Sequence, residues 1–252
     1  MDVAILTVGE ELLAGETENT NATWLAGEIT GRGGRVVEIC TIGDDREAIA
    51  ERVADRAARF DRVIVTGGLG GTPDDLTMAA VADALDRELV VDETVREAAA
   101  ASSAAFVEAH PDLAAKYDLG LDVDRVAETV AGGHLIENPR GLAPGCAVEN
   151  VYVLPGVPSE LRATFEQVAE EFGGDVVLET RYTDAPEGVL AGHLGTLEAT
   201  FDVRAGSYPG ERTDRNRVRV TGESERAVQA AIDWLAERVS LARAPEDVAE
   251  SS

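Results

Sequence analysis

Two glycine-containing loops of this 252-residue sequence hold the residues best suited to chemistry. Asp44 follows Gly43, and Asp74 and Asp75 follow a run of glycines in the segment 67–77, Gly-Gly-Leu-Gly-Gly-Thr-Pro-Asp-Asp-Leu-Thr. Glycine lets a backbone turn tightly and approach a ligand without a Cβ in the way. Carboxylates beside exposed backbone N–H groups are the components of a site that holds a hard cation such as Mg²⁺ against a phosphorylated ligand.

Two further loops have a similar setting but a weaker chemical signal. Glu10 and Glu11 follow the first glycine of the chain, and either could face a site or simply be solvated. Residues 155–160, Pro-Gly-Val-Pro-Ser-Glu, place a proline in a first helical turn, so a structural role explains them as well as a functional one. Asp45 is the expected N-cap of a helix, which leaves Asp44 free to face a cleft.

The elements that must position these loops alternate between strand and helix. Apolar and β-branched runs predict the strands, and apolar residues at helical spacing predict the helices. The predicted order is strand 3–8, helix 21–29, strand 36–42, helix 46–60, strand 62–66 and helix 76–85. This order implies a parallel sheet covered on both faces. Ligands of such sheets bind where strands end and helices begin, so we expect these loops to meet at one sheet edge.

The second half of the chain predicts a further, smaller domain. Residues 92–138 are alanine-rich and acidic and indicate mainly helices, before a strand at 148–154 and a helix at 158–172. Beyond Gly173 the pattern predicts strand 176–182, helix 187–201, strands 203–208 and 218–220, and helix 225–239. We therefore expect an α/β domain at 1–172, a small α+β domain at 175–242 and a flexible acidic tail at 243–252.

The charge balance excludes some classes of partner. The sequence has 48 acidic and 22 basic residues, a formal charge of −26, and Lys116 is its only lysine. No basic patch is visible in the sequence, so neither nucleic acid nor a membrane is an expected partner. An acid-rich, lysine-poor surface is typical of halophilic proteins, because molar salt shortens the Debye length to roughly 3 Å. An acidic surface that serves a basic partner is the alternative.

Several common catalytic and targeting patterns are missing from the sequence. The segment 67–77 lacks the Gly-Lys-Ser/Thr of a P-loop and the glycine spacing of a dinucleotide-binding turn. No Ser-His-Asp or Cys-His set is recognisable, which disfavours a covalent mechanism. His110, His134 and His193 have no metal-ligand spacing. With two cysteines, no targeting segment and no long apolar run, the chain is expected to be cytoplasmic.

Five motifs in a fixed order resemble a known family. They are Gly-Glu-Glu-Leu-Leu…Gly…Asn-Thr-Asn at 9–21, Ile-Gly-Asp-Asp at 42–45, the glycine-rich segment 67–77, Asn-Pro-Arg-Gly-Leu-Ala-Pro-Gly at 138–145 and Leu-Pro-Gly-Val-Pro-Ser-Glu at 154–160. Over about residues 1–170, they resemble the N-terminal part of the CinA (competence/damage-inducible protein A) family, within the MoaB/Mog molybdopterin-binding superfamily. The residues after 174 are similar to the small second domain of CinA-like proteins.

The resemblance implies a three-layer α/β/α domain that binds a small phosphorylated ligand, either molybdopterin or a nucleotide. It also implies that Asp44 and Asp75 are catalytic and hold a divalent metal (Mg, Mn or Co), with potassium as a further candidate ion. CinA-like proteins are linked to metal-dependent hydrolysis of the pyrophosphate of ADP-ribose. The other predicted substrate- and phosphate-binding residues are Glu11, Asn21, Gly67, Gly68, Gly70, Gly71, Thr72, Asp74, Gly141, Pro155, Gly156 and Glu160. Mog-like domains self-associate, so a homo-oligomer is expected.

Three departures from the family pattern bear on function. The C-terminal amidase domain of the family, which deamidates nicotinamide mononucleotide, has no counterpart in these 252 residues. The usual Gly-Pro-Thr-Pro-Asp-Asp has Gly71 in place of its first proline, and an Asn-x-x-Gln-Ala segment is not recognisable in residues 117–135. The leading hypothesis is a metal-dependent nucleotide pyrophosphatase. A non-catalytic binding protein linked to molybdenum cofactor biosynthesis is the alternative, and an oligomeric scaffold is a third.

Overall fold

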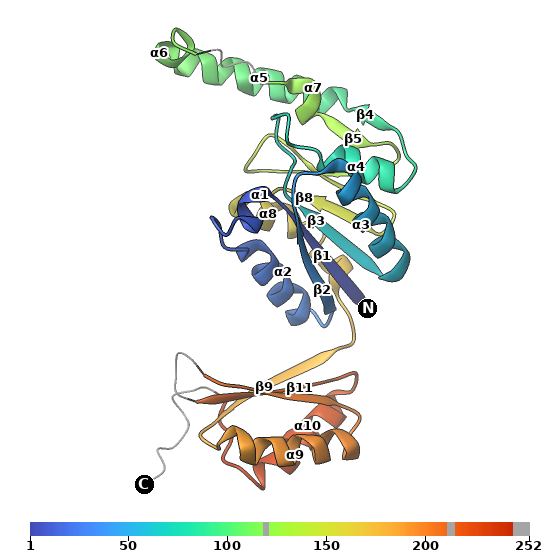
Figure 1. The fold of residues 1–252 in the computed structure, drawn as a ribbon, viewed down its shortest axis with the longest axis vertical. Coiled ribbons are helices and arrows are strands. Elements are labelled where there is room, and N and C mark those ends of the chain that lie inside the picture. Colours follow the sequence, from blue (N-terminus) through green and yellow to red (C-terminus); the bar gives the residue numbers. More distant parts are fainter. Residues whose placement is uncertain (118–120, 211–214, 244–252) are drawn as a thin grey trace. The chain divides into compact units, whose positions relative to one another are not determined.

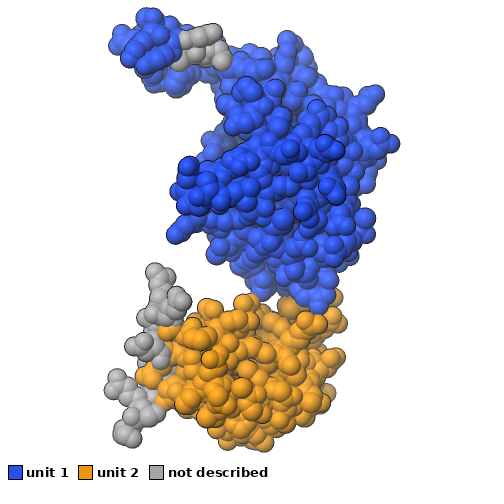
Figure 2. Space-filling view, in the orientation of Figure 1, with its two compact units in different colours: residues 1–173 blue, residues 174–252 orange. Residues whose placement is uncertain are grey.

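The computed structural model describes residues 1–117, 121–210 and 215–243, and the chain divides into two compact units, 1–173 and 174–252 (Figure 2). Each unit has its own apolar core. Apart from Arg243, the predicted acidic tail at 243–252 lies outside the described residues. Within the described ranges, no helix is both long enough and apolar enough to cross a membrane.

Unit 1 is built on a six-stranded sheet with the strand order β2-β1-β3-β8-β7-β6 (Figure 1). Its strands are β1 (Asp2–Val8), β2 (Arg35–Ile42), β3 (Arg62–Thr66), β6 (His134–Ile136), β7 (Gly145–Val148) and β8 (Val151–Leu154). The pairs β1–β2, β1–β3 and β3–β8 are parallel, whereas β7 and β6 continue the sheet in antiparallel fashion. The prediction of a mostly parallel sheet is therefore confirmed.

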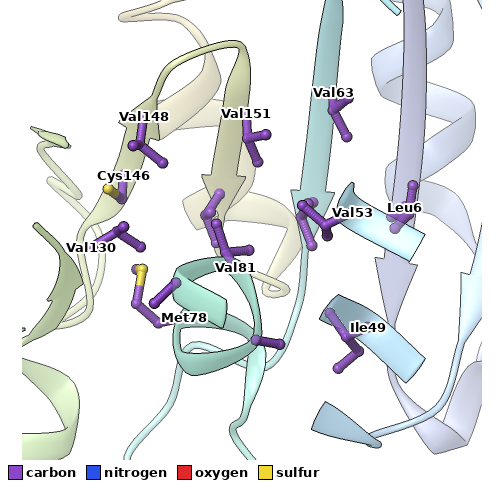
Figure 3. Close-up of a cluster of buried hydrophobic side chains, with 14 of the residues drawn as sticks. Leu6, Ile49, Val53, Val63, Met78, Val81, Val130, Cys146, Val148 and Val151 are labelled. Atoms are coloured by element: carbon purple, nitrogen blue, oxygen red, sulfur yellow. The ribbon is translucent and has the colours of Figure 1, made fainter. Parts of the chain in front are cut away.

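Helices cover both faces of this sheet. One face packs against α2 (Thr20–Gly31), α8 (Pro158–Phe165) and the 3₁₀ helix η1 (Ala169–Phe172), and the other against α3 (Arg46–Arg59) and α4 (Thr77–Ala84). Successive residues of a strand point to opposite faces, so Ile5 of β1 enters the first core and Leu6 the second. Figure 3 shows the second core, in which Ile49 and Met78 approach the strands from α3 and α4. The predicted three-layer α/β/α arrangement is confirmed.

Side-chain caps fix where two of these helices begin. Asp45 accepts a hydrogen bond of 2.8 Å from the backbone N of Ala48 and so caps α3, as predicted. Asn19 caps α2 in the same way, with 3.1 Å to the backbone N of Ala22. Each cap fixes the last residue of the loop that precedes its helix. This helps to position the other residues of the loops before α2 and α3.

The region between α4 and β7 is more mixed than the predicted run of helices. It contains β4 (Leu89–Val91), α5 (Glu93–Ala109), α6 (Pro111–Ala114), α7 (Val123–Val126), β5 (Glu128–Val130) and β6. Another short helix, α1 (Glu10–Leu13), lies much earlier in the chain, between β1 and α2. β4 and β5 form a separate antiparallel pair. Three-residue strands carry too little periodicity to be seen within an alanine-rich sequence.

The predicted single strand at 148–154 is wrong, because the chain forms the antiparallel hairpin β7–β8 there. Its turn contains Glu149 at φ 54°, a left-handed conformation that is uncommon for glutamate. Asn150 anchors the turn, since its Nδ2 donates to the backbone O of Ala57 and of Phe60, both at 2.9 Å. The predicted helix at 158–172 likewise divides into α8 and η1.

Unit 2 has the predicted β-α-β-β-α order. Its elements are β9 (Val177–Thr183), α9 (Glu187–Thr200), β10 (Arg204–Tyr208), β11 (Asn216–Gly222) and α10 (Glu225–Ala236). The three strands form an antiparallel sheet in the order β10-β11-β9. Leu190 and Leu197 of α9 pack with Val228 of α10 against the sheet. The prediction of a small α+β unit is confirmed.

Candidate functional site

Four strand-to-helix loops of unit 1 line a cleft of about 670 Å³. They follow β1, β2, β3 and β8, and the rest of the lining comes from the loop between β6 and β7 and from Leu121 and Val126 at α7. Because β1, β2, β3 and β8 are parallel, their carboxyl ends lie at the same edge of the sheet. The cleft is thus at the edge that the sequence predicted.

Twelve of the fourteen predicted site residues line this cleft. They are Glu11, Asp44, Gly67, Gly68, Gly70, Gly71, Asp74, Asp75, Gly141, Pro155, Gly156 and Glu160. Thr72 and Asn21 are not among the lining residues. Of the two adjacent glutamates, Glu11 lines the cleft and Glu10 does not.

Asp75 closes the glycine-rich loop onto itself. Its Oδ2 accepts hydrogen bonds from the backbone N of Thr72, at 2.8 Å, and from the Thr72 hydroxyl. A Cβ at Gly70 would lie 2.4 Å from the same oxygen, so the loop fits tightly around the carboxylate. Thr72 therefore holds Asp75 instead of offering its donors to the cleft. Asp75 does not cap α4, whose cap residue, Leu76, contributes no side-chain bond.

Asp44 connects the loops that follow β1 and β2. Its Oδ2 accepts a hydrogen bond of 3.1 Å from the backbone N of Glu10, the first residue of α1. The Glu10 side chain lies over Gly43, where a Cβ would be 2.1 Å from Glu10 Oε1. Glu10 therefore packs between the loops, which leaves Asp44 and Glu11 as the acidic groups of this corner of the cleft.

Arg125 of α7 holds the far side of the glycine-rich loop. Its Nη1 donates to the carbonyl oxygens of Thr72, Pro73 and Asp75 at 3.2, 3.4 and 3.3 Å. The pKa of the exposed Asp74 is held below its usual value, chiefly by the nearby Thr72 side chain, then by the backbone of Asp74 itself and by the charge of Arg125. Sequence reasoning missed Arg125, because it lies fifty residues beyond the loop and outside every recognised motif.

Two glycines of neighbouring loops, both in the lining of the cleft, are in contact with each other. Gly67 has φ 106°, and a Cβ there would lie 2.2 Å from the carbonyl oxygen of Val8. A Cβ at Gly156 would lie 3.1 Å from the Cα of Gly67. Asn21 Nδ2 donates to the carbonyl oxygen of Gly156 at 2.6 Å, from a smaller recess beside the cleft. Asn21 thus positions the Gly156 loop instead of lining the cleft.

Glu160, in the first turn of α8, holds the loop between β6 and β7. Asn138 Nδ2 donates to Glu160 Oε2 at 2.7 Å and to the carbonyl oxygen of Ala143 at 2.8 Å. A Cβ at Gly141 would lie 2.1 Å from Glu160 Oε2, so only glycine fits there without a shift. Asn138 belongs to a predicted motif but was not among the predicted site residues.

The cleft also has an apolar side that the sequence did not reveal. Its members are Val8, Leu69, Leu121, Val126, Leu142 and Val157. Leu142 and Val157 are 45% and 52% exposed, so both side chains are accessible to a ligand that enters the cleft. An apolar wall in a cleft that also contains carboxylates and a glycine-rich backbone suits a ligand with a planar ring and a phosphate.

The carboxylates of the cleft do not form a complete metal centre. Over the part of the chain that the structure describes, no three His, Cys, Asp or Glu side chains are grouped to hold a metal ion. Asp44 and Asp75 nevertheless line the same cleft, and Oδ1 of each makes no hydrogen bond within the described ranges. Mg²⁺ is usually held by one or two carboxylates together with substrate phosphates and waters, and this donor set fits that chemistry.

Comparison with known proteins assigns both units. Residues 4–173 match the family described as "Probable molybdopterin binding domain", and residues 175–245 match "FAD synthase, middle domain". A protein of Archaeoglobus fulgidus is 34% identical over 239 residues, which cover 94% of this chain and 97% of that protein. A CinA-like protein of Thermotoga neapolitana is 34% identical over 245 residues, which cover 94% of this chain but 57% of that protein.

A solved structure agrees with these matches. The protein CinA of Thermoplasma acidophilum, described as having unknown function, is 30% identical, with a TM-score of 0.56, and covers 68% of this chain and 97% of that one. The predicted CinA resemblance is thereby confirmed, whereas the likeness of unit 2 to an FAD synthase domain was not foreseen. The chain belongs to the probable molybdopterin-binding domain family, as a CinA-like member in which this domain precedes one similar to the middle domain of FAD synthase.

Proposed function

We propose that the cleft binds a nucleotide diphosphate such as ADP-ribose and hydrolyses its pyrophosphate with the help of a divalent cation. One observation carries this proposal. Asp44 and Asp75 come from different loops yet line one cleft, beside the glycine-rich backbone, each with a carboxylate oxygen left without a hydrogen bond in the described ranges. Two such carboxylates and a phosphorylated substrate together supply the ligands that Mg²⁺ prefers.

Different residues of the cleft bind the phosphates, the ring and the cation, according to their chemistry. The backbone of residues 68–71 offers N–H groups to the phosphates, because Gly68, Gly70 and Gly71 place no side chain between this backbone and a ligand. The N–H of Gly67 is already used, since it donates to the carbonyl oxygen of Leu154 at 3.2 Å. Leu142 and Val157 cover the face of a base or other ring. Asp44 and Asp75 hold the cation, which when bound would neutralise phosphate charge and lower the pKa of a nearby water.

A second candidate function is binding of molybdopterin or a nucleotide without turnover, in molybdenum cofactor biosynthesis. The family description supports it, as does the lack of a three-residue metal cluster among the described residues. The same apolar wall and glycine-rich loop would serve a phosphorylated pterin. Both candidate functions include assembly into a homo-oligomer and potassium as a further candidate ion.

Hydrolysis of ADP-ribose in molar KCl tests the first candidate directly. Mg²⁺, Mn²⁺ and Co²⁺ are scanned with wild type, Asp44→Asn and Asp75→Asn, and NaCl replaces KCl in one series to test potassium. Asp45→Asn is the matched control, because it makes the same change next to Asp44, lies outside the cleft lining and keeps an efficient helix cap. We expect metal-dependent formation of AMP and ribose phosphate in wild type and Asp45→Asn only, with a loss of at least about a hundredfold in the other two variants.

The competing outcome is equally specific. If folded wild type shows no turnover with any metal but binds ADP-ribose or a pterin phosphate, and Asp45→Asn binds equally well, the hydrolase proposal fails. The binding function then stands. Circular dichroism of each variant in the assay buffer separates loss of the site from loss of the fold.

A further inference from the structure

The sheet of unit 2 exposes a face that neither of its helices covers. Val218 and Val220 of β11 are fully buried among residues of α9 and α10. Because neighbouring residues of a strand point to opposite faces, Arg217 and Arg219 lie on the other face. Figure 1 shows α9 and α10 on the same side of this sheet. We call the opposite side the open face.

The register of the three strands places aromatic and basic residues in one row of the open face. Tyr208 of β10 pairs with Arg217 of β11, which pairs in turn with Tyr182 of β9. Residues directly opposite each other in an antiparallel sheet have neighbouring side chains on the same face. Arg219 is in the next row, and Arg204 of β10 follows at the end of the same face.

Tyr208 lies across the sheet between the two arginines of β11. Its ring centroid is 5.5 Å from the guanidinium carbon of Arg217 and 5.9 Å from that of Arg219. A Cβ at Gly206, two residues earlier on the same face, would lie 3.1 Å from the ring. The lack of a side chain at Gly206 therefore gives the ring room to lie close to the strand. Tyr208 remains 43% exposed.

The charges of the open face contrast with those of the chain as a whole. Residues 1–173 hold 33 acidic and 13 basic residues, whereas residues 174–243 hold 12 and nine. Arg204, Arg217 and Arg219 form no ion pair within the ranges that the structure describes, although the chain has 48 acidic residues. The alternation along β11 thus gathers on one face arginines that the sequence spreads among valines.

We propose that the open face binds single-stranded nucleic acid, with a base stacked on Tyr208 and the adjacent phosphates paired with Arg217 and Arg219. Sheet faces that bind single strands combine these two groups, because every base has a π-face and every nucleotide a phosphate. An acidic protein surface would pair with the arginines, but it would not explain why the exposed ring of Tyr208 lies between them. Two copies meeting by this face would oppose arginine to arginine, which disfavours self-association there.

The negative charge of the rest of the chain restricts this binding to moderate salt concentrations. At low ionic strength its charge repels a polyanion over tens of ångströms, whereas at 0.15 M the Debye length is about 8 Å and contacts at the open face dominate. Three arginines can release few counterions. The logarithm of the binding constant should therefore fall with the logarithm of salt concentration with a slope no steeper than about −2.

Fluorescence anisotropy of a labelled 12-nucleotide oligo(U) with the full chain, in 0.2–0.5 M KCl, tests the proposal. Arg217→Gln and Tyr208→Ser should each weaken binding by about tenfold, a loss typical of one stacked base or one charged contact. Arg226→Gln is the matched control, since it removes the same charge from an exposed position in α10, away from the open face. It should leave the affinity unchanged. Circular dichroism confirms that each variant is folded.

Three results would overturn the proposal. One is no binding of oligo(U) or oligo(dT) by folded wild type at any salt concentration in the range. Another is an equal loss in Arg226→Gln and Arg217→Gln, and the third is displacement of the oligonucleotide by poly-aspartate at equal charge, which would indicate an acidic protein partner. Asp44→Asn, in the cleft, should not alter oligonucleotide binding, so this proposal and the proposed hydrolase activity fail or stand separately.

Discussion

Asp75 and Thr72 form a closed pair, in which one carboxylate oxygen accepts both the backbone N–H, at 2.8 Å, and the hydroxyl of the threonine three residues earlier. The same carboxylate is a proposed ligand of the cation. Asp75 therefore shapes the glycine-rich loop with one oxygen and faces the cleft with the other. Substitution of Asp75 alone changes both properties together, whereas substitution of Thr72 changes the loop and leaves the carboxylate in place.

Thr72→Val should weaken ligand binding without abolishing it. Valine keeps the backbone N–H but removes the hydroxyl, so Asp75 loses one of two bonds that fix its orientation. A hydrogen bond to an exposed carboxylate contributes about 1 kcal/mol, which corresponds to roughly fivefold in affinity. Calorimetric titration with ADP-ribose and Mg²⁺ measures this, with Thr72→Ser as the control that retains the hydroxyl. Equal affinity of Thr72→Val and wild type would show that the bond does not matter to the ligand.

Arg125→Gln should loosen the glycine-rich loop. Glutamine has the wrong reach and one donor group in place of the guanidinium that bonds three carbonyl oxygens of the loop. We expect faster amide hydrogen exchange in residues 68–76 and weaker ligand binding, with little change in the free energy of global unfolding. Arg140→Gln, a change of the same charge in another loop of unit 1, should leave the exchange of these residues unaltered. Unchanged exchange in Arg125→Gln would contradict the role assigned to this side chain.

Gly67→Ala should be strongly destabilising. Residue 67 has φ 106°, and an added Cβ would lie 2.2 Å from the carbonyl oxygen of Val8, so both conformation and space exclude it. We expect a loss of at least about 2 kcal/mol in the free energy of unfolding, measured with urea in molar KCl. Gly27→Ala, in the middle of α2 with nothing within 4 Å of the new Cβ, should instead stabilise by about 0.5–1 kcal/mol. Similar effects of the two substitutions would refute this assignment.

Stability should fall at alkaline pH through Tyr152. Burial, and then the hydrogen bond to Glu171, raise the pKa of its phenol to about 12 from an ordinary value of 10.0. The folded state thus holds this proton more tightly than the unfolded state. Its contribution to stability is complete below pH 10 and is lost as the pH rises towards 12.

The slope of unfolding free energy with pH in this window should be negative and no larger than about 1.4 kcal/mol per pH unit for the one proton. Urea unfolding between pH 9 and 11.5 measures it, and Tyr152→Phe should flatten the curve. Tyr182→Phe serves as the comparison, because its ring is only partly buried. A curve of Tyr152→Phe as steep as that of wild type would assign the alkaline loss to other groups.

High salt should stabilise the fold. A formal charge of −26 produces self-repulsion that salt screens, so the melting temperature should rise steadily between 0.1 and 2 M KCl. Sorbitol at matched osmolality controls for excluded solute. A melting temperature that is independent of KCl would contradict the interpretation of the acidic surface as an adaptation to salt.

The loops that line the cleft could be predicted because their residue types indicate the local backbone conformation. The segment 67–77 follows a β-branched strand and needs glycine at φ values that few other residues adopt, and Asp45 has the type and place of a helix cap. Parallel strands then bring such loops together without further information. Local sequence therefore sufficed for the sheet edge and for most of the lining.

Features decided by contacts between distant residues could not be predicted. The turn at Glu149 has no glycine or proline to mark it, and its position depends on Asn150 reaching the carbonyl oxygens of Ala57 and Phe60. Arg125 acts on the glycine-rich loop from α7, and a helix of four residues leaves almost no periodic signal. In each case the deciding partner is about fifty residues or more away in the chain.

The contact between Gly67 and Gly156 restricts how the cleft could be redesigned or could diverge. Any side chain at 156 would press on the turn at 67, which itself has no room to retreat from Val8. The two positions should therefore vary jointly or not at all, and the floor of the cleft is closed to gradual enlargement. Changes in ligand preference can arise more easily at the rim, where Leu121, Leu142 and Val157 could be exchanged one at a time without disturbing the sheet.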